Sequence, residues 1–270
     1  MNPGFVLAAN PNQSLSQLAH LLGASHQIAK AAQLLYSAAG FIRKVYTGEL
    51  EPDMPGGKPL DMSQYVKLFA ATRIPGYGRD VWQHKLEEGV TSGHGLVLAH
   101  GQYFTVTILD NSNNPVAPSA IAAQLNAVQE MASKNRFKKS SLLNLGPLTA
   151  LDRQTWSVHY PVVAELNKAT MHEMETALFA LCLDDHLPST TLEAGQLVLH
   201  GESARNRHFD KCFQLIVFRD GLAGVNFEHT AFDGHTILSF IEKIYGGVVE
   251  EGTNRPEPSV YPATPLSFTS

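Results

Sequence analysis

The sequence predicts an α/β fold in which a mixed sheet is flanked by helices, because strand-like and helix-like segments alternate along the chain. Two pairs of strand-like segments are each joined by a short turn: 96–99 with 103–109, and 214–218 with 223–228. Such hairpins add antiparallel strands to a sheet whose other strands are connected through helices. The third observation is a long run of apolar residues at helical spacing over 15–46, which predicts a covering helix.

The remaining elements follow from the same patterns. The first helix ends in a Pro- and Gly-rich loop at 49–59. Further helices are predicted at 62–71, 119–133, 152–159, 171–183 and 236–245. Ser119 is the expected N-cap of its helix, and Glu173 and Glu175 are expected near the positive end of theirs. Beyond Gly246 small and polar residues dominate, and no closing element is predicted.

Composition argues against several classes of function. The 270 residues have a formal net charge of −5 and no dense basic block, so a nucleic-acid partner is not expected. The 12 histidines show no metal-ligand spacing, and we predict no metal site. The two cysteines, Cys182 and Cys212, fit a reducing compartment rather than a disulfide framework. No apolar stretch approaches the roughly 20 residues of a membrane span. The first ten residues are not typical of a secretory signal or a mitochondrial presequence.

The run 228–234 (EHTAFDG) is the best candidate for chemistry. A neutral imidazole can take a proton from an attacking hydroxyl, and His229 lies just past a predicted strand, where a loop can hold its ring in a cleft. Asp233 could return to this imidazole or to a nearby Arg, and Gly234 would permit the tight turn. Glu228 should point to the opposite face. The simpler interpretation is a surface or hydrogen-bonded histidine, and spacing alone does not decide between the two.

The sequence around His229 contains a longer pattern. The chain reads NRHFDK at 206–211, then a strand, Asp-Gly at 220–221, a second strand and EHTAFDG. This order resembles the active-site block of the choline/carnitine acyltransferase family, which runs Asn-Arg-Trp-Phe/Tyr-Asp-Lys, strand, Asp-Gly, strand, Glu-His-Ser-x-x-Asp/Glu-Gly. Other family-like segments are 59–65 (PLDMSQY), 68–69, 72–75 (TRIP), 148–149, Arg153 with Trp156, and 179–184 (FALCLD). Segments 60–65, 182–185 and 227–229 look most similar to the mitochondrial, inner-membrane carnitine palmitoyltransferase branch.

This resemblance implies the CoA-dependent acyltransferase sandwich of chloramphenicol acetyltransferase and transfer of a fatty acyl group between CoA and carnitine. His229 would be the general base for the carnitine hydroxyl, or for the CoA thiol in reverse, with no acyl-enzyme. Asp233 would orient the catalytic region. The residues expected to support the site structurally are Asn206, Arg207, Asp210, Lys211, Thr230 and Gly234. Acyl-CoA and CoA would enter as substrates, and no cofactor is implied.

Three other residues and two departures from the family also bear on the site. Arg73, Arg153 and Trp156 could be buried in polar networks. His208 stands where the family usually has Trp, and Thr230 where it usually has Ser. Threonine keeps the hydroxyl, whereas histidine removes aromatic area, so we expect local repacking at 208 rather than lost chemistry.

Length is the largest departure. Family members are more than twice as long, and the resemblance makes 1–270 a partial domain that bears the histidine, with an N-terminal segment and the C-terminal half expected to be missing. That half would supply most of the CoA site, the carnitine contacts and an oxyanion donor, whose loss alone costs about 10²–10³ in rate. We therefore expect little or no activity from this chain alone and a complementing C-terminal half as a partner. Mitochondrial location, and membrane association of a full-length protein, are implied by resemblance only.

Two other hypotheses stay open. The chain could be a non-catalytic binding module of the same family, or an acyltransferase for choline or another alcohol. An exposed apolar face, where a second half would dock, would favour a catalytic fragment over an adapted module. The matches at 60–75 and 206–211 argue against an unrelated acyltransferase that shares only a His-x-x-x-Asp-Gly motif.

Overall fold

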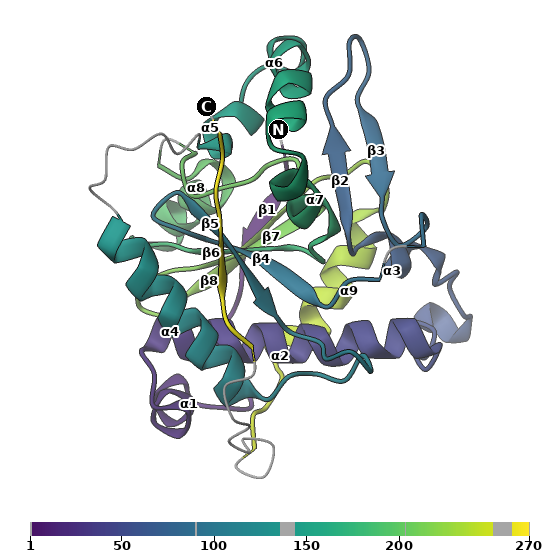
Figure 1. The fold of residues 1–270 in the computed structure, drawn as a ribbon. Helices are drawn as coiled ribbons and strands as arrows, with labels where there is room; N and C mark the ends of the chain where they lie inside the picture. Colours follow the sequence, from purple (N-terminus) through teal and green to yellow (C-terminus); the bar gives the residue numbers. More distant parts are fainter. Residues whose placement is uncertain (1, 90, 136–143, 203, 251–260, 270) are drawn as a thin grey trace.

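The computed structural model describes residues 2–89, 91–135, 144–202, 204–250 and 261–269. In these ranges the strands of the main sheet are β1 (Gly4–Val6), β4 (His94–Ala99), β5 (Gln102–Thr107), β6 (Ala180–Leu183), β7 (Phe213–Val217), β8 (Ala223–Phe227) and β9 (Thr264–Leu266). Their order across the sheet is β1-β8-β7-β6-β4-β5-β9. Two further strands, β2 (Ala71–Ile74) and β3 (Val81–His84), form a hairpin beside the sheet (Figure 1).

Helices cover both faces of this sheet. They are α1 (Leu15–Leu22), α2 (His26–Thr47), α3 (Ser63–Lys67), α4 (Pro118–Asn135), α5 (Leu145–Thr149), α6 (Arg153–Leu166), α7 (Lys168–Thr176), α8 (Thr191–His200) and α9 (Gly234–Tyr245). Helices α2, α4 and α9 pack on one face, and α6, α7 and α8 pack on the other (Figure 1). The predicted class, an α/β fold with a mixed sheet flanked by helices, is confirmed.

The strands at the centre of the sheet are buried on both faces. β4, β6 and β7 are neighbours and run parallel, whereas β5 and β8 join them antiparallel. Alternate residues of each strand enter different cores: Val97 and Leu215 face α2 and α4, while Leu96 and Ile216 face α6 and α8. Central parallel strands therefore consist of nearly continuous apolar residues rather than alternating ones.

That apolar continuity explains the largest error in the predicted elements. The segment 171–183 was predicted as one helix, but α7 ends at Thr176 and Ala180–Leu183 is the central strand β6. Periodicity cannot distinguish a short fully buried strand from a buried helix. Glu173 and Glu175 consequently lie in the second half of α7, so their expected position near its positive end is wrong.

The predicted helix over 15–46 is also wrong as one element. Gly23 adopts a left-handed conformation with φ 56° and ends α1, donating its N–H to His20 O. Ser25 then begins α2, and its hydroxyl accepts from Ile28 N. A glycine at this position ends a helix because it lacks the Cβ that penalises positive φ.

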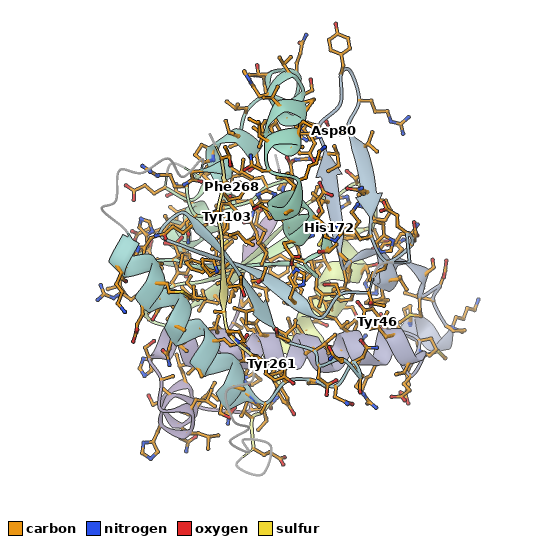
Figure 2. All side chains as sticks on the ribbon, viewed as in Figure 1. Tyr46, Asp80, Tyr103, His172, Tyr261 and Phe268 are labelled. Carbon is orange, nitrogen blue, oxygen red and sulfur yellow. The ribbon has the colours of Figure 1, made fainter. Side chains whose placement is uncertain are left out.

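Three smaller predictions need correction. The helix predicted at 62–71 covers only Ser63–Lys67, and Ala71 already belongs to β2. Ser119 is not an N-cap, because α4 begins one residue earlier at Pro118. A closing element does exist: β9 pairs with β5 at the sheet edge, and Phe268 packs against Tyr103 with ring centroids 5.5 Å apart (Figure 2).

The side chain of Gln27 connects α2 to the sheet. It is buried, its Nε2 donates to Asp184 O and Val217 O at 2.8 Å each, and its Oε1 accepts from Gln129 Nε2 at 2.7 Å. One side chain thus joins α2, α4 and the carboxyl ends of β6 and β7.

Replacing Gln27 with Met should lower the free energy of unfolding by about 1–3 kcal/mol, because buried polar partners lose their hydrogen bonds. Urea unfolding followed by circular dichroism measures this change. Gln17→Met on the exposed face of α1 is the matched control and should change stability by less than about 0.5 kcal/mol. Equal effects of the two substitutions would contradict the connecting role of Gln27.

Candidate active site

His229 lies on the loop that leaves β8. Strand β8 ends at Phe227, and Glu228 still donates its N–H to Cys212 O at 2.9 Å, so the backbone is held up to the residue before the histidine. Glu228 is buried, whereas His229 is exposed. The imidazole lies 5.8 Å from the Phe227 ring, between centroids. Within the described residues it makes no hydrogen bond, so both ring nitrogens are available to a ligand.

Asp233 does not return to the imidazole as predicted. Its Oδ1 accepts from Thr236 N at 3.0 Å, which makes Asp233 the N-cap of α9. Its backbone N–H donates to Gln64 Oε1 at 2.9 Å, and Gln64 Nε2 donates back to the Asp233 carboxylate at 3.4 Å. The hydrogen bond from the Thr236 N–H lowers the pKa of the Asp233 carboxyl. The carboxylate therefore fixes the start of α9 and joins it to α3, rather than contacting His229 or an arginine.

Gly234 is the first residue of α9, and its backbone is not in the left-handed region that would require glycine. The predicted tight turn is therefore wrong. The position contacts the histidine instead: a Cβ placed on Gly234 would lie 3.9 Å from His229 Nε2. The absence of a side chain leaves one side of the imidazole open.

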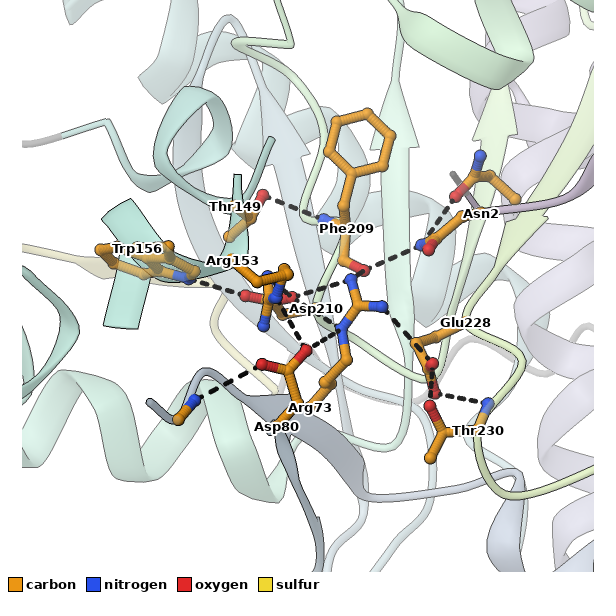
Figure 3. A network of polar contacts seen from close by, with 12 residues as sticks. Asn2, Arg73, Asp80, Thr149, Arg153, Trp156, Phe209, Asp210, Glu228 and Thr230 are labelled. Atoms are coloured by element: carbon orange, nitrogen blue, oxygen red, sulfur yellow. Dashed lines mark hydrogen bonds and ion pairs between the residues drawn. The ribbon is translucent and has the colours of Figure 1, made fainter. Parts of the chain in front are cut away.

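Behind the loop, buried charges connect Glu228 to the block 206–211. Arg73 on β2 lies between two carboxylates: its Nη2 is 3.1 Å from Asp210 Oδ1, and its Nη1 is 3.5 Å from Glu228 Oε1 (Figure 3). Glu228 in turn accepts from Thr230 N at 3.0 Å and from the Thr230 hydroxyl. The two residues that flank His229 are thus joined to each other, and through Arg73 to Asp210.

Asp210 is the centre of this network. Arg153 Nη1 donates to Asp210 Oδ1 at 2.7 Å, and Trp156 Nε1 donates to Oδ2 at 2.8 Å (Figure 3). Asp80 joins the two arginines from the other side, at 2.7 Å from Arg153 Nε and 3.5 Å from Arg73 Nε. Burial raises the pKa of the Asp210 carboxyl, and the two guanidinium groups oppose that shift. Arg73, Arg153 and Trp156 belong to one polar network, as expected, but only Trp156 is buried in it; the side chains of Arg73 and Arg153 are 19% and 29% exposed.

Lys211 supports a neighbouring helix rather than the histidine directly. Its ammonium group is buried and donates to Met174 O, Glu175 O and Thr72 Oγ1 at 2.9–3.1 Å. Two of these acceptors are carbonyl groups in the last turn of α7, where a cation is favourable. Burial lowers the pKa of Lys211 to about 8.

Asn206 and Arg207 lie at the other end of the sheet. Asn206 Nδ2 donates to Leu183 O, at the carboxyl end of β6, and Arg207 pairs with Asp184 at 2.7 Å. His229 follows Phe227, which is opposite the first residue of β7. The block 206–211 therefore runs from the carboxyl ends of β6 and β7 towards their amino ends. Only its last residues, Asp210 and Lys211, lie at the end where His229 is, so a supporting role beneath the site does not extend to Asn206 and Arg207.

His208 is buried against Tyr103, with ring centroids 5.9 Å apart. Its Nδ1 has no hydrogen-bond partner in the described part of the chain. Together with Trp156 and Asp210, His208 lines a small cavity of about 10 Å³. Burial, with Lys211 adding to it, lowers the pKa of His208 from 6.5 to about 3.

Exposed apolar side chains occur near the loop and on α6. Val66 on α3 and Leu238 on α9 are exposed on the two helices that Gln64 joins. On α6, Val158, Val162 and Leu166 follow each other at four-residue spacing and are 64%, 61% and 54% exposed.

The described residues contain neither a membrane-spanning helix nor a cluster of metal-ligating side chains. No helix there is long and apolar enough to cross a membrane. No group of three or more His, Cys, Asp or Glu side chains in the same residues could hold a metal ion.

Two functional contacts were missed by the sequence analysis. Gln64 holds Asp233 across 169 positions of sequence, and Asp80 joins Arg73 to Arg153. Gln64 was noticed only as part of a family-like segment. Asp80, the acid after the Gly-rich turn at 76–78, showed no local signal, because Arg153, its nearer partner in space, is 73 residues away in the sequence.

Arg73→Met should lower the free energy of unfolding by about 3 kcal/mol or more, because it leaves the buried Glu228 and Asp210 with one cation fewer. Arg73→Met combined with Glu228→Gln should lose less than the sum of the single changes, since the uncompensated carboxylate is removed as well. Urea unfolding of the four proteins of the cycle measures the coupling, and Arg79→Met in the exposed hairpin turn is the control. Strict additivity would show that the pair does not interact.

His208 should make the fold sensitive to acid. Unfolded His208 takes up a proton below about pH 6.5, whereas the folded residue does so only near pH 3, so stability present above 6.5 is lost as the pH falls between these values. The wild-type protein should therefore lose up to about 1.4 kcal/mol per pH unit more than His208→Phe in this window. Urea unfolding at about pH 7 and pH 5 tests this, with the exposed His159→Phe as control. If the free energy of unfolding changed equally with pH in the wild type and in His208→Phe, the lowered pKa of His208 would be refuted.

A family model described as Choline/Carnitine o-acyltransferase matches residues 1–270. Carnitine O-palmitoyltransferase 2, mitochondrial, of Mus musculus is 31% identical over 251 residues, which cover 81% of this chain and 37% of that protein. The Homo sapiens protein of the same name is 29% identical over 272 residues, 88% and 39% of the two chains. Carnitine O-acetyltransferase of Mus musculus is 27% identical over 277 residues, 98% and 41%.

The chain spans about two fifths of the length of these relatives. The family model, by contrast, matches it from its first to its last residue. The resemblance carried by the blocks at 59–75 and 206–234 is thereby confirmed, and the chain belongs to the choline/carnitine O-acyltransferase family.

Proposed function

We propose that residues 1–270 form the histidine-bearing part of a carnitine O-acyltransferase that moves a fatty acyl group between CoA and carnitine, with His229 as general base. The observation that carries the proposal is the state of this side chain. Its ring is exposed and free of hydrogen bonds in the described residues, while the buried Glu228 before it pairs with Arg73 and accepts a hydrogen bond from Thr230 after it. An imidazole presented in this way can meet a substrate hydroxyl without first losing an internal partner.

The reaction needs a single proton relay. His229 removes the proton from the carnitine hydroxyl, the oxygen attacks the thioester carbonyl, and the carbon–sulfur bond breaks. The leaving CoA sulfur then takes this proton from the imidazolium, so that acylcarnitine and CoA thiol are formed. In the reverse direction His229 takes the proton from the thiol. CoA and carnitine act as substrates, and no resident cofactor is required.

Direct attack also fits the chemistry of the two cysteines. Cys182 and Cys212 are buried free thiols. Burial raises the pKa of Cys182 to about 12 and also raises that of Cys212. Because the thiolate is the nucleophilic form, neither residue suits an acyl-enzyme intermediate.

Asp233 is proposed as a positioning residue rather than a partner of the imidazole. It caps α9 and holds α3 through Gln64, so it determines where the loop from 229 to 233 ends. Thr230 and Gly234 are also proposed as positioning residues. Thr230 holds Glu228, and Gly234 leaves room beside the imidazole ring. For the wider fold we propose the sandwich of CoA-dependent acyltransferases such as chloramphenicol acetyltransferase.

One observation favours a catalytic fragment over a non-catalytic module. Exposed apolar residues on α3, α6 and α9 offer surfaces that a further domain could cover. The similar proteins are named carnitine acyltransferases, which supports carnitine over choline as the acceptor. The palmitoyltransferase relatives are named mitochondrial, and we propose the same compartment for this protein.

A chimera tests the proposal. Residues 1–270 would replace the matching stretch of Mus musculus carnitine O-palmitoyltransferase 2, and CoA thiol release from palmitoyl-CoA and carnitine would be followed. His229→Ala should lower kcat by about 10²–10⁴-fold, the contribution of a general base. His235→Ala, an exposed histidine six residues on, is the matched control and should leave the rate within about twofold.

The chain on its own should release little or no thiol in the same assay. Turnover by the isolated chain equal to that of the chimera would contradict the need for a second half. A His229→Ala chimera as active as the parent would remove His229 from its role as base.

A further inference from the structure

Another cavity lies at the start of β8, whereas His229 follows the other end of this strand. It has a volume of about 330 Å³ and is formed by the N-terminal segment 8–15, helices α1 and α2, and the turn 220–223 between β7 and β8. Strand β8 begins at Ala223 in this wall and ends at Phe227 beside His229, so the two places are separated by the length of the strand. The cavity is therefore independent of the proposed acyl-transfer site.

One of the residues that line the cavity is the buried Lys30 of α2. Lys30 is only 6% exposed, and its Nζ donates to Gln33 Oε1 at 2.9 Å and to Tyr245 O at 3.4 Å. Among the described residues no carboxylate lies within ion-pair distance of this nitrogen. Burial lowers the pKa of Lys30 to about 8. A buried charge without a counter-charge is unfavourable, because two neutral oxygens replace only part of the lost hydration.

The surroundings of Lys30 compensate this charge only in part. Tyr245 is the last residue of α9, and a helix carboxyl end carries about half a negative charge. Asp220 is exposed at the rim of the cavity, and its Oδ1 accepts from Leu222 N at 2.9 Å. An incoming anion would therefore find a cation that has no full partner.

The remaining wall combines polar residues of the N-terminal segment, Asn10, Gln13 and Ser14, with a larger apolar surface. Leu18 and Ala223 are buried, and Leu15 is partly buried. Ala8 and Ala9 are exposed at the mouth. A ligand for this cavity must combine one negative charge with an apolar body, and a volume near 330 Å³ is at the small end of the roughly 300–1,000 Å³ typical of ligand sites.

We propose that this cavity binds a medium-chain monocarboxylate, an unbranched fatty acid of about eight carbons, with its carboxylate on Lys30 and its alkyl chain along Leu15, Leu18 and Ala223. The carboxylate supplies the missing counter-charge. The chain removes apolar surface from water, so affinity should rise about fourfold for each added methylene until the cavity is filled.

Isothermal titration calorimetry with sodium octanoate tests the proposal on the whole chain. Saturable binding of one octanoate is expected, and Lys30→Met, which keeps the length of the side chain but not its charge, should weaken it at least tenfold. Lys44→Met, an exposed lysine on the same helix outside the cavity, should leave binding within about twofold. Octanamide, which has the same chain without the charge, should bind at least tenfold more weakly than octanoate.

Ala9→Trp provides a second test that leaves the core unchanged. It narrows the exposed mouth and should weaken octanoate binding even if Lys30→Met fails to fold. Three results would overturn the proposal: no saturable binding to the wild-type chain, binding unaffected by both substitutions, or equal affinity for acetate and octanoate, which would indicate an anion site without an apolar chain.

Discussion

The arrangement of the candidate active site depends on the ion network around Asp210. This carboxylate pairs with Arg73 and Arg153 and accepts a hydrogen bond from Trp156. Arg73 also pairs with Glu228, the residue before His229. Buried charges are costly unless each has a partner, so the β2–β3 hairpin, α6 and the strand pair β7–β8 can occupy only the positions that satisfy all of them. The imidazole remains free because its neighbours, and not the imidazole, make these bonds.

Helix α9 extends the same constraint through the molecule. Its first turn is capped by Asp233 and joined to α3 by Gln64. At its other end Gln33 Nε2 donates to Ile244 O and Lys30 donates to Tyr245 O, both from α2. A helix held at both termini is a rigid support for the loop that precedes it, and this loop carries His229. Because the support of the histidine is spread over distant elements, substitutions far from the ring should affect its position.

The sequence predicted the parts of the fold that have a local signal. The hairpins at 96–109 and 214–228 were found because their strands are bounded by turns, and α9 because its apolar residues form one face. Strand β6 was mistaken for helix because a buried strand shows no alternation, and Gly23 was overlooked because apolar spacing continues on both sides of it. In the site, His229 was found, but the partner of Asp233 was not. Gln64 lies 169 residues away, and no short-range pattern can show a contact of that kind.

The central claim is that buried partners on either side hold His229 in place while its ring stays free. Backbone amide order parameters for residues 228–232 in the wild-type chain, measured by ¹⁵N NMR relaxation, test this most directly. The account predicts values close to about 0.85, those of rigid backbone, at His229 and its neighbours. Values below about 0.6 at these residues, with a rigid β8 before them, would mean that the network does not hold the loop and would contradict the claim.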